Sequence, residues 1–154
     1  MKHANSMFRT VLAFTLVVFF SAIAFAGGDK YSIYLNNKLM TEQYVLNKTI
    51  SLKSLQLSNA NSNDEITVYY NHCGTVGTGR SIVLKDENNN ILKEWKFSDE
   101  SGAAMTIKVK DILDIQKKNA KAEITLVYYS NKYLPNGRSL TAIKVGDKTT
   151  AFVQ

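Results

Sequence analysis

The feature that most constrains the fold is an alternation of apolar and polar residues that recurs along the chain. Residues 105–110 alternate at every position, and Ile91, Trp95 and Phe97 share one parity while their polar neighbours share the other. A period of two is typical of a β-strand with one buried face. Turn-forming residues separate the runs at Asn36-Asn37, Asn88-Asn89-Asn90, Pro135-Asn136-Gly137 and Gly146-Asp147. We therefore expect an all-β protein of about ten antiparallel strands.

One segment has a helical pattern instead. Asp111 is suited to begin a short helix over residues 111–118, because Ile112, Leu113 and Ile115 follow it at helical spacing. A helix of this length does not change the predicted fold class.

Two stretches of the chain, about 49–97 and 106–154, resemble one another. Glu65-Ile66-Thr67 matches Glu123-Ile124-Thr125, and Gly79-Arg80-Ser81 matches Gly137-Arg138-Ser139. Because an isolated half would leave one sheet face in water, the repeat predicts a β-sandwich of two sequence-related, Greek-key-like halves. The pattern that ends in the Tyr-Tyr pairs also resembles the corner of immunoglobulin-type sandwiches. The paired cysteines and the matching Trp of that family are absent, so membership is not predicted.

Residues 1–26 have the pattern of a cleaved signal peptide. A weakly basic start precedes a largely apolar run from Val11 to Ala26, which ends in the small-x-small sequence Ala24-Phe25-Ala26. The run is shorter than the roughly 20 residues that a membrane-spanning helix needs. We therefore expect export to the periplasm or the extracellular medium, and a single domain over residues 27–154 with no membrane span after cleavage.

Composition argues against several functional classes. The chain has 19 Lys and Arg against 13 Asp and Glu, but the basic residues are dispersed rather than clustered as in nucleic-acid-binding surfaces. A single Cys excludes an intramolecular disulfide. One His beside one Cys is too few ligands for zinc, and no cofactor fingerprint is present. We expect no cofactor, no metal and no nucleic acid.

Beyond the predicted signal peptide, the use of arginine is the most distinctive polar feature of the sequence. Arg80 and Arg138 each stand between a Gly and a Ser, while the other basic residues there are lysines. Counting across the loops places Arg80 opposite Tyr69 and Arg138 opposite Tyr128. Strand alternation turns one Tyr of each adjacent pair outward. The predicted binding residues are Arg80, Arg138, Tyr69, Tyr70, Tyr128 and Tyr129.

Two roles are open for these residues. An outward phenol beside a guanidinium suits a polar or acidic glycan, or a cell-envelope protein surface, and the repeat would present two such patches for bivalent binding. The alternative is structural, with each Arg tying its hairpin to the sheet.

His72 and Cys73 are the candidate residues for a catalytic function. They are adjacent and are the only His and Cys beyond the leader. Neighbouring strand residues point to opposite faces, so only a sharp turn at Gly74 would bring the imidazole to the thiol. The favoured function is a secreted or periplasmic, non-catalytic interaction or ligand-binding module. The alternative is a small thiol-dependent enzyme or redox factor that uses Cys73 and His72.

Overall fold

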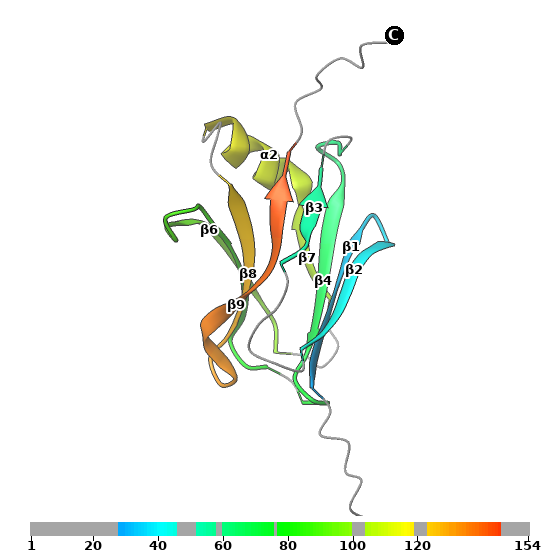
Figure 1. The fold of residues 1–154 in the computed structure, drawn as a ribbon, viewed down its shortest axis with the longest axis vertical. Coiled ribbons are helices and arrows are strands. Elements are labelled where there is room, and N and C mark those ends of the chain that lie inside the picture. The colour runs from blue at the N-terminus through cyan, green and yellow to red at the C-terminus, as the bar shows by residue number, and fades with distance from the viewer. Residues whose placement is uncertain are drawn as a thin grey trace, which may run out of the picture.

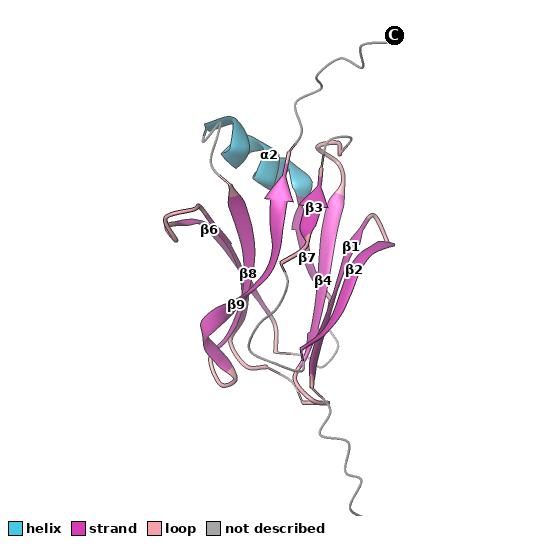
Figure 2. Ribbon diagram, viewed as in Figure 1, coloured by secondary structure: helices cyan, strands magenta, loops and turns pink. Residues whose placement is uncertain are grey.

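The chain forms two β-sheets and one short helix (Figures 1 and 2). The structure, a computed structural model, describes residues 28–45, 52–57, 60–75, 77–99, 104–118 and 123–145. One sheet has the strand order β2-β1-β4-β7, and the other has the order β3-β9-β8-β5-β6. The elements are β1 (Asp29–Leu35), β2 (Lys38–Val45), β3 (Ser54–Gln56), β4 (Glu65–Asn71), β5 (Arg80–Lys85), β6 (Ile91–Phe97), β7 (Met105–Lys108), α2 (Val109–Lys118), β8 (Ile124–Ser130) and β9 (Leu134–Lys144). The predicted all-β class is confirmed.

The two sheets share one hydrophobic core. Alternate residues of β1 and β4, such as Ile33 and Ile66, are fully buried together with Leu84 of β5 and Leu126 of β8. Helix α2 lies across one end of the two sheets (Figure 1), where it buries Ile112. The predicted helix is thus confirmed, and it begins two residues earlier than expected.

The β1–β2 hairpin has the tight turn that its sequence predicts. Leu35 pairs with Lys38, which leaves only Asn36 and Asn37 in the loop, and their φ angles are +48° and +64°. A two-residue hairpin loop of this type needs positive φ at both positions, and Asn tolerates this conformation better than most residues.

The described residues contain nine strands, close to the predicted number. Two details differ from the prediction, and the first is that β3 runs parallel to β9 rather than antiparallel. The predicted turn at 135–137 is also misplaced, because these residues lie inside β9 and the chain turns at 131–133 instead. Between Tyr128 and Ser130 the register of β9 slips, and Gly137 there has a φ of +72°. The turn-forming residues therefore mark an irregularity within a strand.

The two similar stretches of sequence do not pair in the same way. In the first, β4 and β5 lie in different sheets, whereas in the second β8 and β9 are antiparallel neighbours in one sheet. The predicted strand-for-strand match of two halves is therefore not found. The similarity between β4 and β8 has a local explanation, because each is an interior strand whose alternate residues enter the common core.

The predicted signal peptide lies outside the described residues, as does the turn expected at 146–147. Within the described part of the chain, no helix is long and apolar enough to cross a membrane.

Replacing Gly137 by Ala will destabilise the protein more than replacing Gly74. Both glycines have positive φ, but a Cβ at Gly137 would lie 2.4 Å from Tyr129 Cζ, whereas nothing lies within 4 Å of one at Gly74. We expect Gly74→Ala to cost about 1 kcal/mol and Gly137→Ala about 2–4 kcal/mol, because the Tyr129 ring must also move. Urea unfolding measures both, and equal losses would contradict the packing of Tyr129 on Gly137.

Candidate functional site

Five of the residues singled out in the sequence meet at the end of the two sheets opposite α2. They come from β4, the turn after it, β8 and β9, and they gather around one carboxylate that the sequence did not single out. That carboxylate belongs to Asp29, the first residue of β1. The five residues are Tyr70, His72, Cys73, Tyr128 and Arg138. We refer to Asp29 and these five residues as the Asp29 cluster.

The imidazole of His72 is enclosed and fully occupied. Its side chain is 3% exposed, with Nδ1 3.3 Å from Asp29 Oδ2 and Nε2 3.1 Å from the Tyr128 hydroxyl. Because an ionised carboxylate only accepts, Nδ1 carries the proton and Nε2 accepts from Tyr128. The rings of Tyr70 and Tyr133 each lie 4.7 Å from the imidazole, centroid to centroid.

His72 is neutral at physiological pH. Burial lowers the pKa of the imidazole, and this effect outweighs the nearby Asp29 carboxylate, which raises it. The Arg138 guanidinium lowers the pKa further. The imidazole therefore acts as a hydrogen-bonding bridge between β1 and β8.

The Asp29 carboxylate contacts the side chains of three residues besides His72. The Tyr70 hydroxyl donates to Oδ2 at 2.9 Å, Arg138 Nη1 lies 3.7 Å from the same oxygen, and Cys73 Sγ donates to Oδ1 at 3.8 Å. One carboxylate thus links β1 to β4, to the turn after β4 and to β9 across the sheets.

A row of tyrosine rings extends the cluster into the core. Tyr70 stacks on Tyr128 with a centroid distance of 4.2 Å, and Tyr31 lies parallel to Tyr70 at 6.1 Å. Burial raises the pKa of Tyr31 and of Tyr128 to about 12, and it raises the pKa of Tyr70 as well. The three phenols are therefore neutral donors, and the stacked rings join one sheet to the other.

Cys73 occupies a sharp turn, as the catalytic alternative required. His72 and Thr75 bridge across Cys73 and Gly74, whose φ angles are +48° and +81°. The thiol is exposed, while the His72 ring turns into the protein. The carboxylate of Asp29 contacts both side chains, so the acceptor of the thiol proton is an oxygen of Asp29. No group of three or more His, Cys, Asp or Glu suited to a metal occurs in the described ranges.

The two arginines have different surroundings. Arg138 pairs with Tyr128 in the sheet register, as predicted, and its guanidinium turns to Asp29. Arg80 pairs with Phe97, so the prediction that it lies opposite Tyr69 is wrong. The reason is that β4 and β5 belong to different sheets. Arg80 is 2% exposed, and its Nε and one terminal nitrogen both donate to the Ser98 carbonyl.

One tyrosine of each predicted pair is buried and the other is not. Tyr70 and Tyr128 face the core, Tyr69 is 41% exposed and Tyr129 is partly exposed. Tyr69 lies on the four-stranded sheet and Tyr129 on the five-stranded sheet, so the two more exposed phenols of the predicted patches belong to different sheets.

Tyr69 belongs to a larger apolar area on the outer face of the four-stranded sheet. Its ring meets Tyr34 edge to face at 5.7 Å, and Tyr34 pairs with Leu39 on β2. Tyr44, further along β2, lies under the Lys30 ammonium at 5.0 Å. We refer to Tyr34, Leu39, Tyr44 and Tyr69 as the Tyr face.

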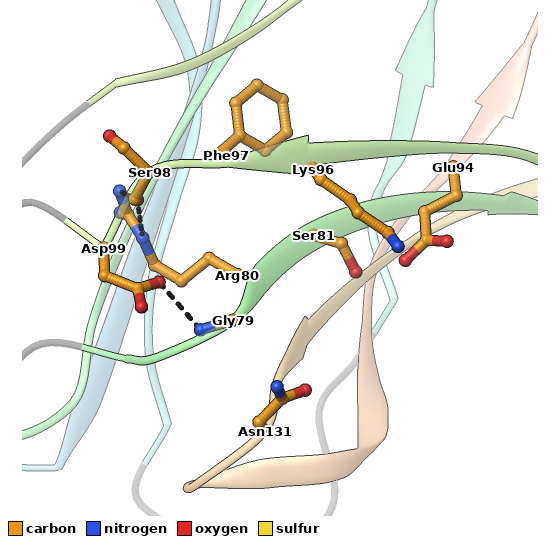
Figure 3. Close-up of a pocket in the computed structure, with 9 residues that line it drawn as sticks. All are labelled: Gly79, Arg80, Ser81, Glu94, Lys96, Phe97, Ser98, Asp99 and Asn131. Atoms are coloured by element: carbon orange, nitrogen blue, oxygen red, sulfur yellow. Dashed lines mark hydrogen bonds between the residues drawn. The ribbon is translucent and has the colours of Figure 1, made fainter.

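A groove with a volume of about 420 Å³ opens on the other sheet, beside Arg80 (Figure 3). Its lining comes from the start of β5, the end of β6 and the turn between β8 and β9. The residues that line it are Gly79, Arg80, Ser81, Glu94, Lys96, Phe97, Ser98, Asp99 and Asn131. Neither His72 nor Cys73 lines this groove.

Sequence reasoning missed Asp29 and most of the groove. Asp29 is separated by more than 40 residues from Tyr70 and His72, and nothing in its local sequence distinguishes it from other surface carboxylates. Glu94 and Lys96 were part of an alternating strand pattern, which predicts that they face outward but not that they border a hollow.

Comparison with known proteins gives no relative from which a role could be transferred. No family model matches the chain, and neither a curated protein nor a solved structure is significantly similar to it.

The stability of the protein will fall as the pH drops below about 6.5. The folded pKa of His72 is below its ordinary value of 6.5, so the unfolded chain binds more protons in this window. Stability is therefore full above pH 6.5, falls as the unfolded imidazole protonates, and stops falling below the folded pKa. We expect the melting temperature to fall between pH 7.5 and pH 5.0, and to fall less in His72→Gln.

An NMR titration of His72 in the unaltered protein provides an independent check. An imidazole pKa at or above 6.5 would contradict the expected sign, whatever the stability of the variant.

Replacing Arg80 by Lys will cost about 1–3 kcal/mol of unfolding free energy, because one ammonium cannot reproduce two buried N–H donors on the Ser98 carbonyl. Arg138→Lys is the matched control. Arg138 is half-buried and sits 3.7 Å from Asp29, so we expect a smaller loss. Chemical denaturation of both variants measures the difference. An equal or larger loss in Arg138→Lys would contradict the structural role given to Arg80.

Proposed function

We propose that this protein is a secreted or periplasmic, non-catalytic interaction module with a β-sandwich fold, and that its Tyr face docks on another protein. The observation that carries the proposal is the concentration of exposed large apolar side chains on one sheet. Of the six such side chains in the described residues, four lie on β2 or β4, at Leu39, Met40, Tyr44 and Tyr69.

The sandwich assignment rests on strand order. In immunoglobulin-type sandwiches a sheet of strands A, B, E and D faces a sheet of strands C, F and G. Here β1-β4-β7 corresponds to A, B and E, while β5-β8-β9 corresponds to C, F and G. The parallel β3 and the hairpin partner β6 extend the second sheet at its two edges. We infer that the protein has this topology, with β2 added outside β1.

The Tyr70–Tyr128 stack supports this inference. In antibody domains a disulfide joins strands B and F across the core. In this chain β4 and β8 hold those positions, and the stacked phenols join them with a centroid distance of 4.2 Å. Two aromatic rings can thus replace a covalent link in a chain with one Cys.

A protein partner fits the Tyr face better than a glycan does. Sugars need hydrogen-bonding groups around an aromatic platform, but Leu39 adds aliphatic surface to the Tyr face, and Lys30 is engaged by Glu42 at 3.0 Å. Exposed apolar groups rimmed by charges are typical of protein interfaces.

The thiol-dependent alternative has less support. A nucleophilic Cys needs a nearby base with a free nitrogen, whereas both nitrogens of His72 have partners in Asp29 and Tyr128. The glycan-binding patches built on both arginines also have less support, because the Arg80 guanidinium is buried.

Site-specific photo-crosslinking in the native host tests the docking face. A benzoylphenylalanine at position 44 or 69 should give the same discrete adduct with one envelope protein, identified by mass spectrometry. Position 91 is the matched control, because Ile91 and Tyr44 are equally exposed at 63% but lie on different sheets. Adducts that also form from position 91, adducts only with a second copy of the chain, or no adduct would contradict the proposal.

A further inference from the structure

The groove of Figure 3 contains polar side chains that the protein itself does not use. Lys96 and Glu94 lie two residues apart on the outer face of β6, and Asn131 faces them from the turn between β8 and β9. Within the described residues, the side chains of these three residues form no hydrogen bond or ion pair with the rest of the protein. The Ser81 hydroxyl lies beside Lys96, its neighbour in the sheet register. An ammonium, a carboxylate, an amide and a hydroxyl therefore border one hollow.

The walls of the groove are fixed by contacts behind these side chains. Arg80 holds the Ser98 carbonyl, and the Gly79 amide donates to Asp99 Oδ1 at 2.7 Å. These bonds tie the start of β5 to the segment after β6. The groove is thus formed before any ligand arrives, which reduces the ordering cost of binding.

Asn131 can occupy its position only because residue 79 is a glycine and has no side chain. Gly79 has a φ of +56°, and a Cβ there would lie 2.1 Å from Asn131 Nδ2. The backbone N–H of Asn131 donates to the Thr78 carbonyl at 2.8 Å, which anchors the turn against the segment before β5. Any side chain at position 79 would push the Asn131 amide group out of its place at the edge of the groove.

We propose that this groove binds an acidic sugar residue of the uronic acid type. The carboxylate of the sugar pairs with Lys96, and its hydroxyls donate to Glu94 and exchange hydrogen bonds with Asn131 and Ser81. A volume of about 420 Å³ is in the usual range for small-ligand sites, roughly 300–1,000 Å³.

The mixture of groups around the hollow favours this ligand over other polar molecules. Figure 3 shows the Lys96 ammonium turned toward the Glu94 carboxylate, with the Asn131 amide across the hollow from them. A uronic acid carries a carboxylate that pairs with the ammonium and several hydroxyls that donate to Glu94 and bond to the amide, so one ring satisfies all of these groups. An α-amino acid such as glycine offers opposite charges to Lys96 and Glu94 but has no hydroxyl for Asn131 and Ser81. A neutral sugar leaves Lys96 without a partner.

This proposal does not depend on the protein-docking function, because the groove and the Tyr face lie on different sheets. Failure of the crosslinking at the Tyr face would leave sugar binding at the groove testable, and failure of sugar binding would leave the crosslinking testable.

Titration of the isotope-labelled protein with D-galacturonate, followed by NMR, tests the groove. We expect shifts centred on Lys96, Ser81 and Asn131, with a dissociation constant on the order of millimolar. D-galactose should bind at least threefold more weakly, and glycine should cause no comparable shifts. Lys96→Gln should weaken galacturonate binding by roughly threefold to tenfold, as expected for an exposed charged hydrogen bond.

Two further variants make the result specific. Lys38→Gln removes the same charge from an exposed position on the other sheet and should leave galacturonate binding unchanged. Asn131→Ala should weaken the binding of galacturonate and galactose alike, since this amide contacts hydroxyls. Equal binding of galactose and galacturonate, equal loss in Lys38→Gln and Lys96→Gln, or no shifts at the groove would overturn the proposal.

Discussion

The stack of Tyr70 on Tyr128 is the contact on which the rest of the molecule depends. It crosses the core between interior strands of the two sheets, and the hydroxyls of the two rings bond to Asp29 and to His72. Because the phenols are buried, their hydroxyls need partners, and Asp29 and His72 supply them. Asp29 in turn holds β1 and β9 at the same end of the core. Aromatic packing and polar satisfaction are therefore parts of one arrangement that spans both sheets.

The polar side chains of the protein are of two kinds: some bond to other groups of the protein, and others border the groove, where a ligand can reach them. In the Asp29 cluster the imidazole and the carboxylate have partners inside the protein, and Arg80 is committed to Ser98 in the same way. The side chains of Glu94, Lys96 and Asn131 border a hollow instead. The sequence points to Arg, His and Cys because these residue types are rare in it, whereas Glu94, Lys96 and Asn131 in the groove are of types that are common in it.

Local patterns predicted the local features well. Alternation located the strands, the Asn36-Asn37 pair predicted a hairpin turn, and strand parity correctly separated Tyr69 from Tyr70. Each of these features depends on a few neighbouring residues. The partner of Arg80 was predicted wrongly because it depends on whether β4 and β5 share a sheet. Gly137 looked like part of a turn because positive φ is also required where β9 slips in register.

The first and last strands that the structure describes contact one another although they are far apart in sequence. Asp29 and Tyr31 of the first strand contact Arg138 and Leu140 of the last, and β3 pairs in parallel with β9. A chain that emerges from its N-terminus therefore cannot complete its second sheet or its polar cluster until β9 is available. Closure of β1 against β9 is thus a late step of folding, because these long-range contacts must form before the buried polar groups are satisfied.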